Sequence, residues 1–327
     1  MAEKYIDLHM HLDGSITVEI AKNLGELQGI TLPSQDDEEL GRHLYVPEEC
    51  ESLNDFLNCF GLPLALMQTE KGISEAVRLV ADNVQAQGVI YAEIRFAPQL
   101  HMRKGLTQEK VVLAALDGMK KTDLKCNLIL CCMRGDDSAE GNKETLELAK
   151  KYLVKDGGVV AIDLAGAEAL YPTSDYEELF REAASAGVPF TIHAGEAAGA
   201  DSVKLAIEYG AARIGHGVRI NEDPEVVELV REKKIPLEMC PTSNRMTKAV
   251  QNMKDYPLMD YLDKGIVVTV NTDDMGIENI TLADEFDYLE KYFGFTDEHR
   301  KTVLRNAVGA AFTTEKVKAD LIREMKL

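Results

Sequence analysis

The sequence predicts an α/β fold: a single (β/α)8 barrel of the TIM type, with a helical lid insertion after the first strand and extra helices at the C-terminal end. Short apolar segments rich in β-branched residues alternate with longer amphipathic segments, and there are eight of the apolar segments. This alternation favours parallel strand pairing, and eight repeats favour closure into a barrel. A doubly wound open sheet is the alternative, but no GxGxxG motif follows the first segment.

The elements follow one another in a regular order. The predicted strands are residues 4–9, 89–96, 125–132, 159–164, 188–193, 213–216, 235–240 and 266–271. The predicted helices between them are residues 74–87, 108–121, 142–153, 175–186, 202–208, 224–233 and 257–264. Several of these helices end in a glycine just before the next strand, as helix C-termini often do: Gly88, Gly187 and Gly265. The chain after Thr281 is predicted to form helices that close the outside of the barrel.

The connection between the first two strands, residues 14–88, is unusually long. Such an excursion is expected over the C-terminal mouth of the barrel, where lids lie. It contains an acidic run at residues 36–39, expected to be a solvated surface, and an apolar segment at residues 53–60. Four side chains of this segment have helical spacing that suits either a lid or ordinary packing: Leu53, Phe56, Leu57 and Phe60. No linker or repeat divides the chain, so residues 1–327 are expected to form one domain.

Composition and charge exclude several classes of partner. The 327 residues are 45% hydrophobic and carry a net charge of −20, from 36 basic and 56 acidic residues. Such a field repels nucleic acid and anionic membranes and favours a neutral or cationic small molecule. No segment approaches the ~20 apolar residues that cross a bilayer, and the start of the chain lacks the apolar run of a signal peptide. The six cysteines form no CxxC pair, which indicates reduced thiols in a cytoplasmic protein.

Histidine and acidic residues gather at the predicted carboxyl ends of the strands, where barrel enzymes carry their catalytic groups. The first strand offers His9 and His11, whose rings project to the same side because they lie two residues apart. Alone, this pair is equally well explained by core packing. Further polar groups follow at the ends of the fourth, fifth, sixth and eighth strands: Asp163, His193, Glu196, His216, Asp273 and Asp274. Their gathering at one end of the barrel indicates an active site.

These residue types suit a catalytic zinc site. Catalytic zinc takes about three or four nitrogen and oxygen ligands, keeps one position open, and lowers the pKa of a bound water toward ~7. We expect one zinc ion per chain, held by His9, His11, His193 and Asp273. Glu196 is a candidate proton donor if burial raises its pKa, and His216 is a candidate to hold or deprotonate the water. Asp274 is free to bind substrate. The predicted chemistry is metal-assisted hydrolysis.

Six segments make the chain resemble the adenosine deaminase family. They occur in the family's order and span almost the full length: His9-Met10-His11-Leu12-Asp13-Gly14, Asp163-Leu164-Ala165-Gly166-Ala167-Glu168, His193-Ala194-Gly195-Glu196, Arg213-Ile214-Gly215-His216-Gly217, Cys240-Pro241-Thr242-Ser243-Asn244 and Asn271-Thr272-Asp273-Asp274. The resemblance implies a zinc-bearing (β/α)8 barrel, in agreement with the fold predicted above.

The resemblance also implies roles for the matching residues. Glu196 would protonate purine N1, which makes C6 electrophilic, and His216 would orient the attacking water. Asp274 would contact N7, the backbone N–H of Gly166 would reach N3, and Asp13 would bind a ribose hydroxyl. The implied enzyme is a hydrolase that converts adenosine and 2′-deoxyadenosine to inosine and ammonia in purine salvage. The apolar segment defined above would cover the substrate.

Other substrates and functions remain as alternatives. Adenine, a 5′-thio-nucleoside and aminodeoxyfutalosine are related substrates, although Thr242 is more typical of nucleoside deaminases. AMP is disfavoured, because the motif loops offer few basic residues to clamp a phosphate. A cytidine-type deaminase would carry HxE and PCxxC motifs, and the sequence has neither motif. A binuclear amidohydrolase would carry a lysine on the fourth strand, and residues 159–164 contain no lysine. A non-catalytic purine- or metal-binding protein on the same barrel would not need Glu196 or His216.

Several conspicuous residues are expected to be structural. Glu93 and Arg95 should form an ion pair inside the barrel, and Cys240 should form part of the wall of the site rather than act as a nucleophile. Three histidines outside the strand ends are expected at the surface or in packing: His43, His101 and His299. Many members of the family carry proline where this chain has Met275, so the shape of the last loop does not follow from the resemblance.

Overall fold

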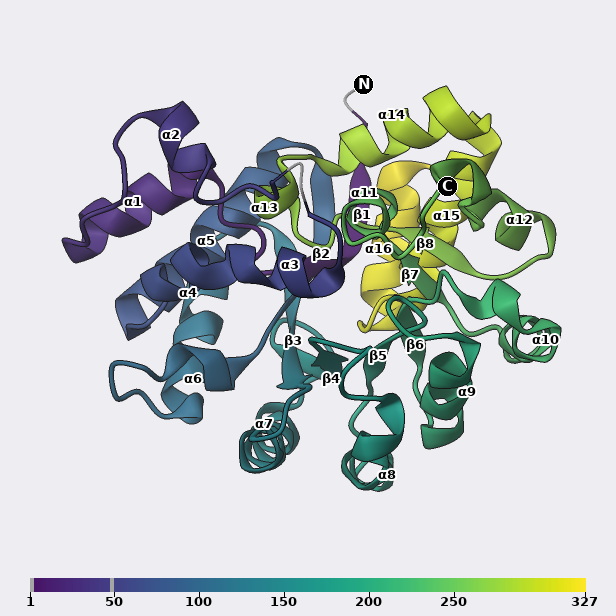
Figure 1. The fold of residues 1–327 in the computed structure, drawn as a ribbon, viewed down its shortest axis with the longest axis horizontal. Helices are drawn as coiled ribbons and strands as arrows, with labels where there is room; N and C mark the ends of the chain where they lie inside the picture. The colour runs from purple at the N-terminus through teal and green to yellow at the C-terminus, as the bar shows by residue number, and fades with distance from the viewer. Residues whose placement is uncertain (1–2, 48–49) are drawn as a thin grey trace.

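The computed structural model describes residues 3–47 and 50–327, and these contain the eight predicted strands (Figure 1). The strands are β1 (Tyr5–His11), β2 (Val89–Phe96), β3 (Lys125–Met133), β4 (Val159–Ala165), β5 (Thr191–Ala194), β6 (Arg213–His216), β7 (Leu237–Met239) and β8 (Val268–Val270). They pair in parallel in the orders β1-β2-β3-β4 and β5-β6-β7-β8. β5 and β7 begin later than predicted, after Pro189 and Pro236, because proline has no N–H to donate to the ladder.

Backbone bridges join the two sheets at both edges. The N–H of Ile162 in β4 donates to the carbonyl oxygen of Pro189, just before β5, at 3.0 Å. On the other side, the N–H of His11 donates to the carbonyl oxygen of Asp273, and the N–H of Asp273 donates to that of His9, both at 2.8 Å. The strands therefore form the predicted barrel, and its closure places Asp273 directly beside the histidines of β1.

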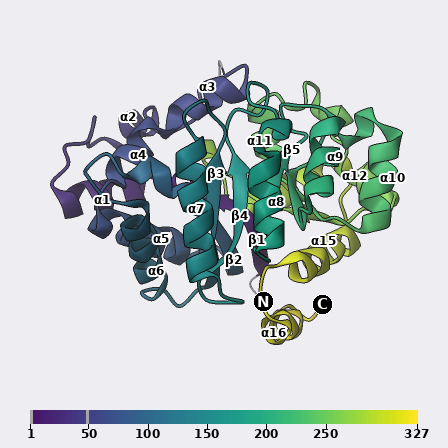
Figure 2. The same ribbon diagram turned by 90° about the horizontal axis from the view of Figure 1, so that it is seen from below.

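Helices surround the strands (Figures 1 and 2). Those following β1 to β7 on the outside are α5 (Glu70–Ala86), α6 (Gln108–Met119), α7 (Ala139–Tyr152), α8 (Glu177–Ser185), α9 (Ala200–Tyr209), α10 (Pro224–Lys233) and α12 (Leu258–Asp263). α13 (Met275–Glu278) follows β8, and the C-terminal helices predicted after Thr281 are α14 (Leu282–Phe293), α15 (Asp297–Ala310) and α16 (Glu315–Met325). Short 3-10 helices are η1 (Asn58–Phe60), η2 (Pro98–His101), η3 (Thr173–Tyr176), η4 (Ile220–Glu222) and η5 (Met253–Asp255). No described helix is long and apolar enough to cross a bilayer.

The long excursion after β1 divides into two parts. Its first helices are α1 (Val18–Gln28) and α2 (Asp37–Gly41), and α1 packs against α5 beside the barrel because Ile20, Ala21 and Leu24 are buried. Among the described residues of the excursion, the side chains that line the cavity at the carboxyl ends of the strands come from the second part: α3 (Leu53–Leu57), η1 and α4 (Gly61–Leu66). The expectation that the whole excursion lies over the mouth was therefore too broad. Figure 2 shows α3 at one end of the molecule and α16 with both termini at the other.

Charged side chains fill the interior of the barrel. Arg95 lies 2.8 Å from both Asp163 and Glu238. Arg213 lies 2.6 Å from Glu93 and 2.5 Å from Glu238, and all five side chains are buried. Glu93 and Arg95 are thus interior ions as predicted, but each pairs with a partner on another strand. The side chains of Glu93 and Arg95 project side by side from β2. Oppositely charged groups on other strands point toward them across the interior, and these become their ion-pair partners.

The three remaining histidines have structural surroundings. His43 is exposed, and His299 accepts a hydrogen bond from the N–H of Thr296 at the start of α15. His101 is buried beside Phe96, with its Nδ1 2.9 Å from the carbonyl oxygen of Met67. These placements agree with the surface or packing roles predicted for them.

The buried network predicts a specific stability loss. Arg213→Met is expected to lower the free energy of unfolding by about 3–5 kcal/mol, because Glu93 and Glu238 lose a buried cation. Urea denaturation measures this change. The control is Arg42→Met, which breaks an exposed pair with Glu38 and should alter stability little. Equal losses in the two variants would contradict the role assigned to the network.

Candidate active site

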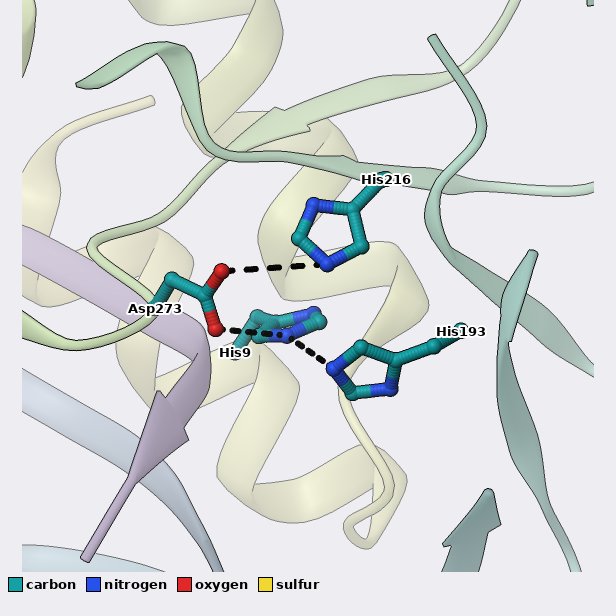
Figure 3. Close-up of side chains that lie close together, drawn as sticks. All are labelled: His9, His193, His216 and Asp273. Atoms are coloured by element: carbon teal, nitrogen blue, oxygen red, sulfur yellow. Dashed lines mark hydrogen bonds and ion pairs between the residues drawn. The ribbon is translucent and has the colours of Figure 1, made fainter. Parts of the chain in front are cut away.

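Four histidines and one aspartate meet at the carboxyl ends of the strands. His9 and His11 come from β1, His193 from β5 and His216 from β6, while Asp273 follows β8. Nε2 of His9 lies 3.1 Å from Nε2 of His193 and 3.1 Å from Oδ1 of Asp273. Figure 3 shows His9, His193 and His216 turned toward the carboxylate of Asp273. Strands distant in sequence therefore bring these side chains to one point.

The spacing of four of these ligand atoms suits a small metal ion. Nε2 of His11 lies 3.1 Å from Nε2 of His193 and 3.3 Å from Oδ1 of Asp273. Zinc ligands at about 2.0–2.1 Å from the metal in a tetrahedron are roughly 3.3 Å apart. The four separations given among the Nε2 atoms of His9, His11 and His193 and Oδ1 of Asp273 are thus compatible with one small metal ion.

The opposite ring nitrogens explain why these Nε2 atoms can act as ligands. Nδ1 of His9 lies 2.7 Å from Glu238, and Nδ1 of His193 lies 2.9 Å from Asp163. The carboxylate of Glu238 holds the ring proton of His9 on Nδ1, so its lone pair is on Nε2 and points into the cluster, and the charge of Asp163 favours the same arrangement in His193. Lone pairs that face each other at 3.1 Å repel unless a cation lies between them. The donor set therefore fits a metal.

The carboxylates of the cluster favour positive charge on His9. Burial and Arg95 oppose protonation of His9, yet the carboxylates of Asp273 and Glu238 raise its pKa to about 9. Burial likewise opposes ionisation of Asp273, but the neighbouring imidazoles of His9 and His216 hold the pKa of its carboxyl well below the ordinary value. The two carboxylates beside His9 therefore favour a positive charge at this point of the cluster.

His216 differs from the other three histidines. Its Nδ1 lies 3.0 Å from the amide nitrogen of Asn244, whose oxygen accepts a hydrogen bond from the hydroxyl of Tyr256 at 3.2 Å. The proton of His216 must therefore be on Nε2, 3.7 Å from Oδ2 of Asp273 and 3.6 Å from Oε2 of Glu196. Burial also holds the pKa of His216 well below its ordinary value. A neutral ring with this N–H is a hydrogen-bond donor in the site and offers no lone pair at Nε2.

Unusual backbone conformations aim several of these groups. His216 and Asp273 have φ of 60° and 64°, in the left-handed region that L-residues rarely adopt and that occurs at functional sites. A Cβ on Gly14 would lie 1.6 Å from Oδ1 of Asp274, so only glycine fits beneath that carboxylate. Gly166 has φ of 106°, which glycine tolerates.

Glu196 is a buried carboxyl group that faces this cluster. Its Oε1 accepts a hydrogen bond from the hydroxyl of Thr247 at 3.1 Å. Burial raises the pKa of Glu196 to about 8, and the negative charges of Asp273 and Glu168 act in the same direction. A carboxyl group that keeps its proton near neutral pH can donate it to a bound molecule.

A cavity of about 220 Å³ lies beside the cluster. This volume is below that of pockets for drug-sized ligands, about 300–1,000 Å³, and suits a small one. Every residue predicted to bind substrate lines it: Asp13, Leu53, Phe56, Leu57, Phe60, Gly166 and Asp274. His11, His193, Glu196, His216 and Asp273 also face it. Among the described residues that line the cavity, none is lysine or arginine.

Three polar residues of the site were not assigned a role from the sequence: Ser243, Asn244 and Thr247. Ser243 and Asn244 belong to the Cys240–Asn244 motif. In the structure this motif forms the N-terminal part of α11 (Pro241–Met246), with Cys240 at the N-cap. The N–H of Thr247 donates to the carbonyl oxygen of Ser243 at 2.8 Å, so both side chains lie on one helix face. Their spacing of four residues was the signal available in the sequence.

Comparison with known sequences gives matches along the whole chain. A family model described as adenosine deaminase matches residues 5–326. An adenosine deaminase of Haemophilus ducreyi is 45% identical over 98% of this chain and 95% of its own length. An adenosine deaminase of Clostridium botulinum is 41% identical, over 97% of this chain and 96% of its own.

Solved structures share the architecture. An adenine deaminase from Arthrobacter aurescens has a TM-score of 0.88 at 31% identity, covering 99% of this chain and 98% of that one. An amidohydrolase from Burkholderia ambifaria, solved with bound Zn, has a TM-score of 0.86 at 20% identity, covering 99% and 91%; it shows the common fold alone. Because the family model and these relatives both align over almost the whole chain, the chain belongs to the adenosine deaminase family.

Proposed function

We propose that the protein is a zinc-dependent hydrolase that deaminates adenosine and 2′-deoxyadenosine, releasing inosine or its 2′-deoxy form and ammonia, in purine salvage. One observation carries the proposal: a cluster of imidazoles and a carboxylate with zinc-like spacing lies at a small cavity, opposite a buried carboxyl group. The relatives named adenosine deaminase, at 41–45% identity over nearly the whole chain, support this reaction.

In this proposal His9, His11, His193 and Asp273 hold one zinc ion. The separations of 3.1–3.3 Å, and the carboxylates beside Nδ1 of His9 and His193, support the assignment. A zinc ion bound there makes a nucleophilic water available at neutral pH, because it lowers the water's pKa to about 7.

The remaining polar groups of the cavity bind and activate the purine. Glu196 protonates N1, since its carboxyl is buried and only one oxygen is bonded to Thr247. His216 directs its Nε2–H between Asp273 and Glu196, where it holds the attacking water and stabilises negative charge that develops on its oxygen. Protonation at N1 draws electrons from C6, so addition of water and loss of ammonia become feasible.

The purine and ribose are held by three further groups. Asp274 contacts N7 and the backbone N–H of Gly166 reaches N3, which orients the base, while Asp13 binds a ribose hydroxyl. All three residues line the cavity. Asp13 and Asp274 are also nearly fully buried, so a ligand that reaches them is shielded from water.

We propose that residues 1–327 form one domain in which residues 53–60, within the 14–88 excursion, act as a lid. Leu53, Phe56, Leu57 and Phe60 supply an apolar wall of the cavity. This wall matches a flat, uncharged base.

The cavity has no clamp for a phosphate, because none of the described residues that line it is lysine or arginine. The substrate is therefore a nucleoside rather than a nucleotide.

The proposed substrate predicts a clear order of turnover. Ammonia release should be fastest with adenosine and 2′-deoxyadenosine, and much slower with adenine, aminodeoxyfutalosine and AMP. The measurement compares kcat/KM for these five compounds, with bound zinc quantified in the same preparation. Turnover of AMP equal to that of adenosine would contradict the phosphate argument. Stoichiometric zinc without any deamination would favour the non-catalytic alternative.

Glu196→Gln is expected to lower kcat by about 10²–10⁴-fold, because an amide cannot donate the proton that N1 requires. Zinc content measured by mass spectrometry should stay at the wild-type level, since Glu196 is not among the proposed ligands. Wild-type turnover in this variant would rule out the assignment of Glu196 as the acid.

The two histidine roles predict different metal contents. His11→Ala should weaken metal binding, because it removes a proposed ligand, whereas His216→Ala should keep zinc and lose turnover. Dialysis against a chelator, followed by zinc titration, measures both affinities. If His216→Ala instead loses the metal and His11→Ala retains it, the ligand set is wrong.

A further inference from the structure

Glu168 makes an unusually dense set of contacts just behind the active site. It follows β4 by a short turn, is 1% exposed, and is absent from the described lining of the cavity. Its carboxylate accepts hydrogen bonds from four consecutive backbone N–H groups and one hydroxyl: Gly195 at 2.8 Å, Glu196 at 3.1 Å, Ala197 at 2.8 Å, Ala198 at 2.9 Å and the Ser202 hydroxyl at 2.6 Å. All four N–H groups belong to the turn that carries Glu196.

The turn needs such an acceptor. Gly195 has φ of 69°, which reverses the chain so that the four N–H groups converge on one point. Convergent N–H groups form a concave site for an anion, and those of the buried Gly195 and Glu196 would be unsatisfied without one. The following helix, α9, adds the positive end of its dipole on the same side.

A chain of hydrogen bonds continues from Ser202 to β5, the strand that carries His193. The hydroxyl of Ser202 lies 2.7 Å from that of Thr173, which accepts a hydrogen bond from Arg134 at 3.0 Å. Arg134 also donates to the carbonyl oxygen of His193 at 2.7 Å. Arg134 and Glu168 therefore fix both ends of the segment 193–198, and the buried guanidinium supplies the positive charge that offsets the carboxylate.

We infer that Glu168 is a positioning residue for the reaction: its carboxylate holds the turn 195–198 so that the side chain of Glu196 faces the cavity. Glu168 acts through Glu196 and does not touch the substrate. The inference rests on the proposed function in so far as Glu196 is the proton donor. A carboxylate suits this task because it only accepts hydrogen bonds, whereas an amide would turn an NH2 group toward N–H donors.

Glu168→Gln, which keeps the size of the side chain, tests the inference. We expect kcat for adenosine, per bound zinc, to fall on the order of 100-fold, the effect of misplacing a catalytic group by about 1 Å. KM and zinc content should change little, because substrate and metal contact other residues. Ser202→Ala, which removes one of the five donors, should lower kcat by a smaller factor. This second variant keeps the test open if Glu168→Gln does not fold.

Asn127→Ala is the matched control. Asn127 is also buried and also holds a loop, since its oxygen accepts hydrogen bonds from the N–H groups of Gly157 at 2.6 Å and Gly158 at 3.3 Å, before β4 at the opposite end of the barrel. The Asn127→Ala variant should have a lower thermal midpoint of unfolding and an unchanged kcat. Unchanged kcat in Glu168→Gln, or an equal loss of kcat in Asn127→Ala, would overturn the inference.

Amide hydrogen exchange gives a readout that needs no activity. Exchange in residues 195–198 should accelerate in Glu168→Gln and stay at the wild-type rate in Asn127→Ala. If the wild-type protein does not deaminate adenosine, the proposed function fails, while the exchange experiment still tests whether Glu168 holds the turn. Equal exchange rates in wild type and Glu168→Gln would overturn the inference on their own.

Discussion

Closure of the barrel between β1 and the end of β8 is the constraint on which the site depends. The two 2.8 Å hydrogen bonds between Asp273 and the backbone of His9 and His11 join residues near opposite ends of the chain. They set the carboxylate of Asp273 against two imidazoles. The left-handed backbone of Asp273 is maintained because both its N–H and its carbonyl oxygen are used in this closure. Without it, the cluster would lose the carboxylate of Asp273.

The interior charges link the stability of the barrel to the chemistry at its mouth. Glu238 contacts Arg95 and Arg213 within the barrel and also Nδ1 of His9. Asp163 likewise lies between Arg95 and His193. The same carboxylates therefore balance buried arginines and lie against the Nδ1 atoms of two histidines. A substitution in this network is expected to affect both folding and metal binding, because neither set of contacts exists separately.

Loops at the mouth are held by polar side chains rather than by apolar packing. Asn244 orients His216, and Glu168 gathers the turn that carries Glu196. Directional hydrogen bonds fix a ring or a carboxyl group more narrowly than dispersion contacts do, which a site that transfers protons requires. The apolar residues of the segment 53–60, by contrast, line the cavity with leucine and phenylalanine side chains.

Local pattern alone determined most of the architecture: the alternation of strands and helices, the C-terminal helices, and the polar residues at the strand ends. These features follow from periodicity and short motifs, which are properties of neighbouring residues. Only the tertiary structure decided which carboxylate meets each histidine, that Thr247 bonds to Glu196, that Glu93 and Arg95 take separate partners, and that α1 packs beside the barrel. Such contacts join residues far apart in sequence, as with His9 and Glu238, which are 229 positions apart. They depend on how the closed barrel aligns its strands, and no local pattern records that alignment.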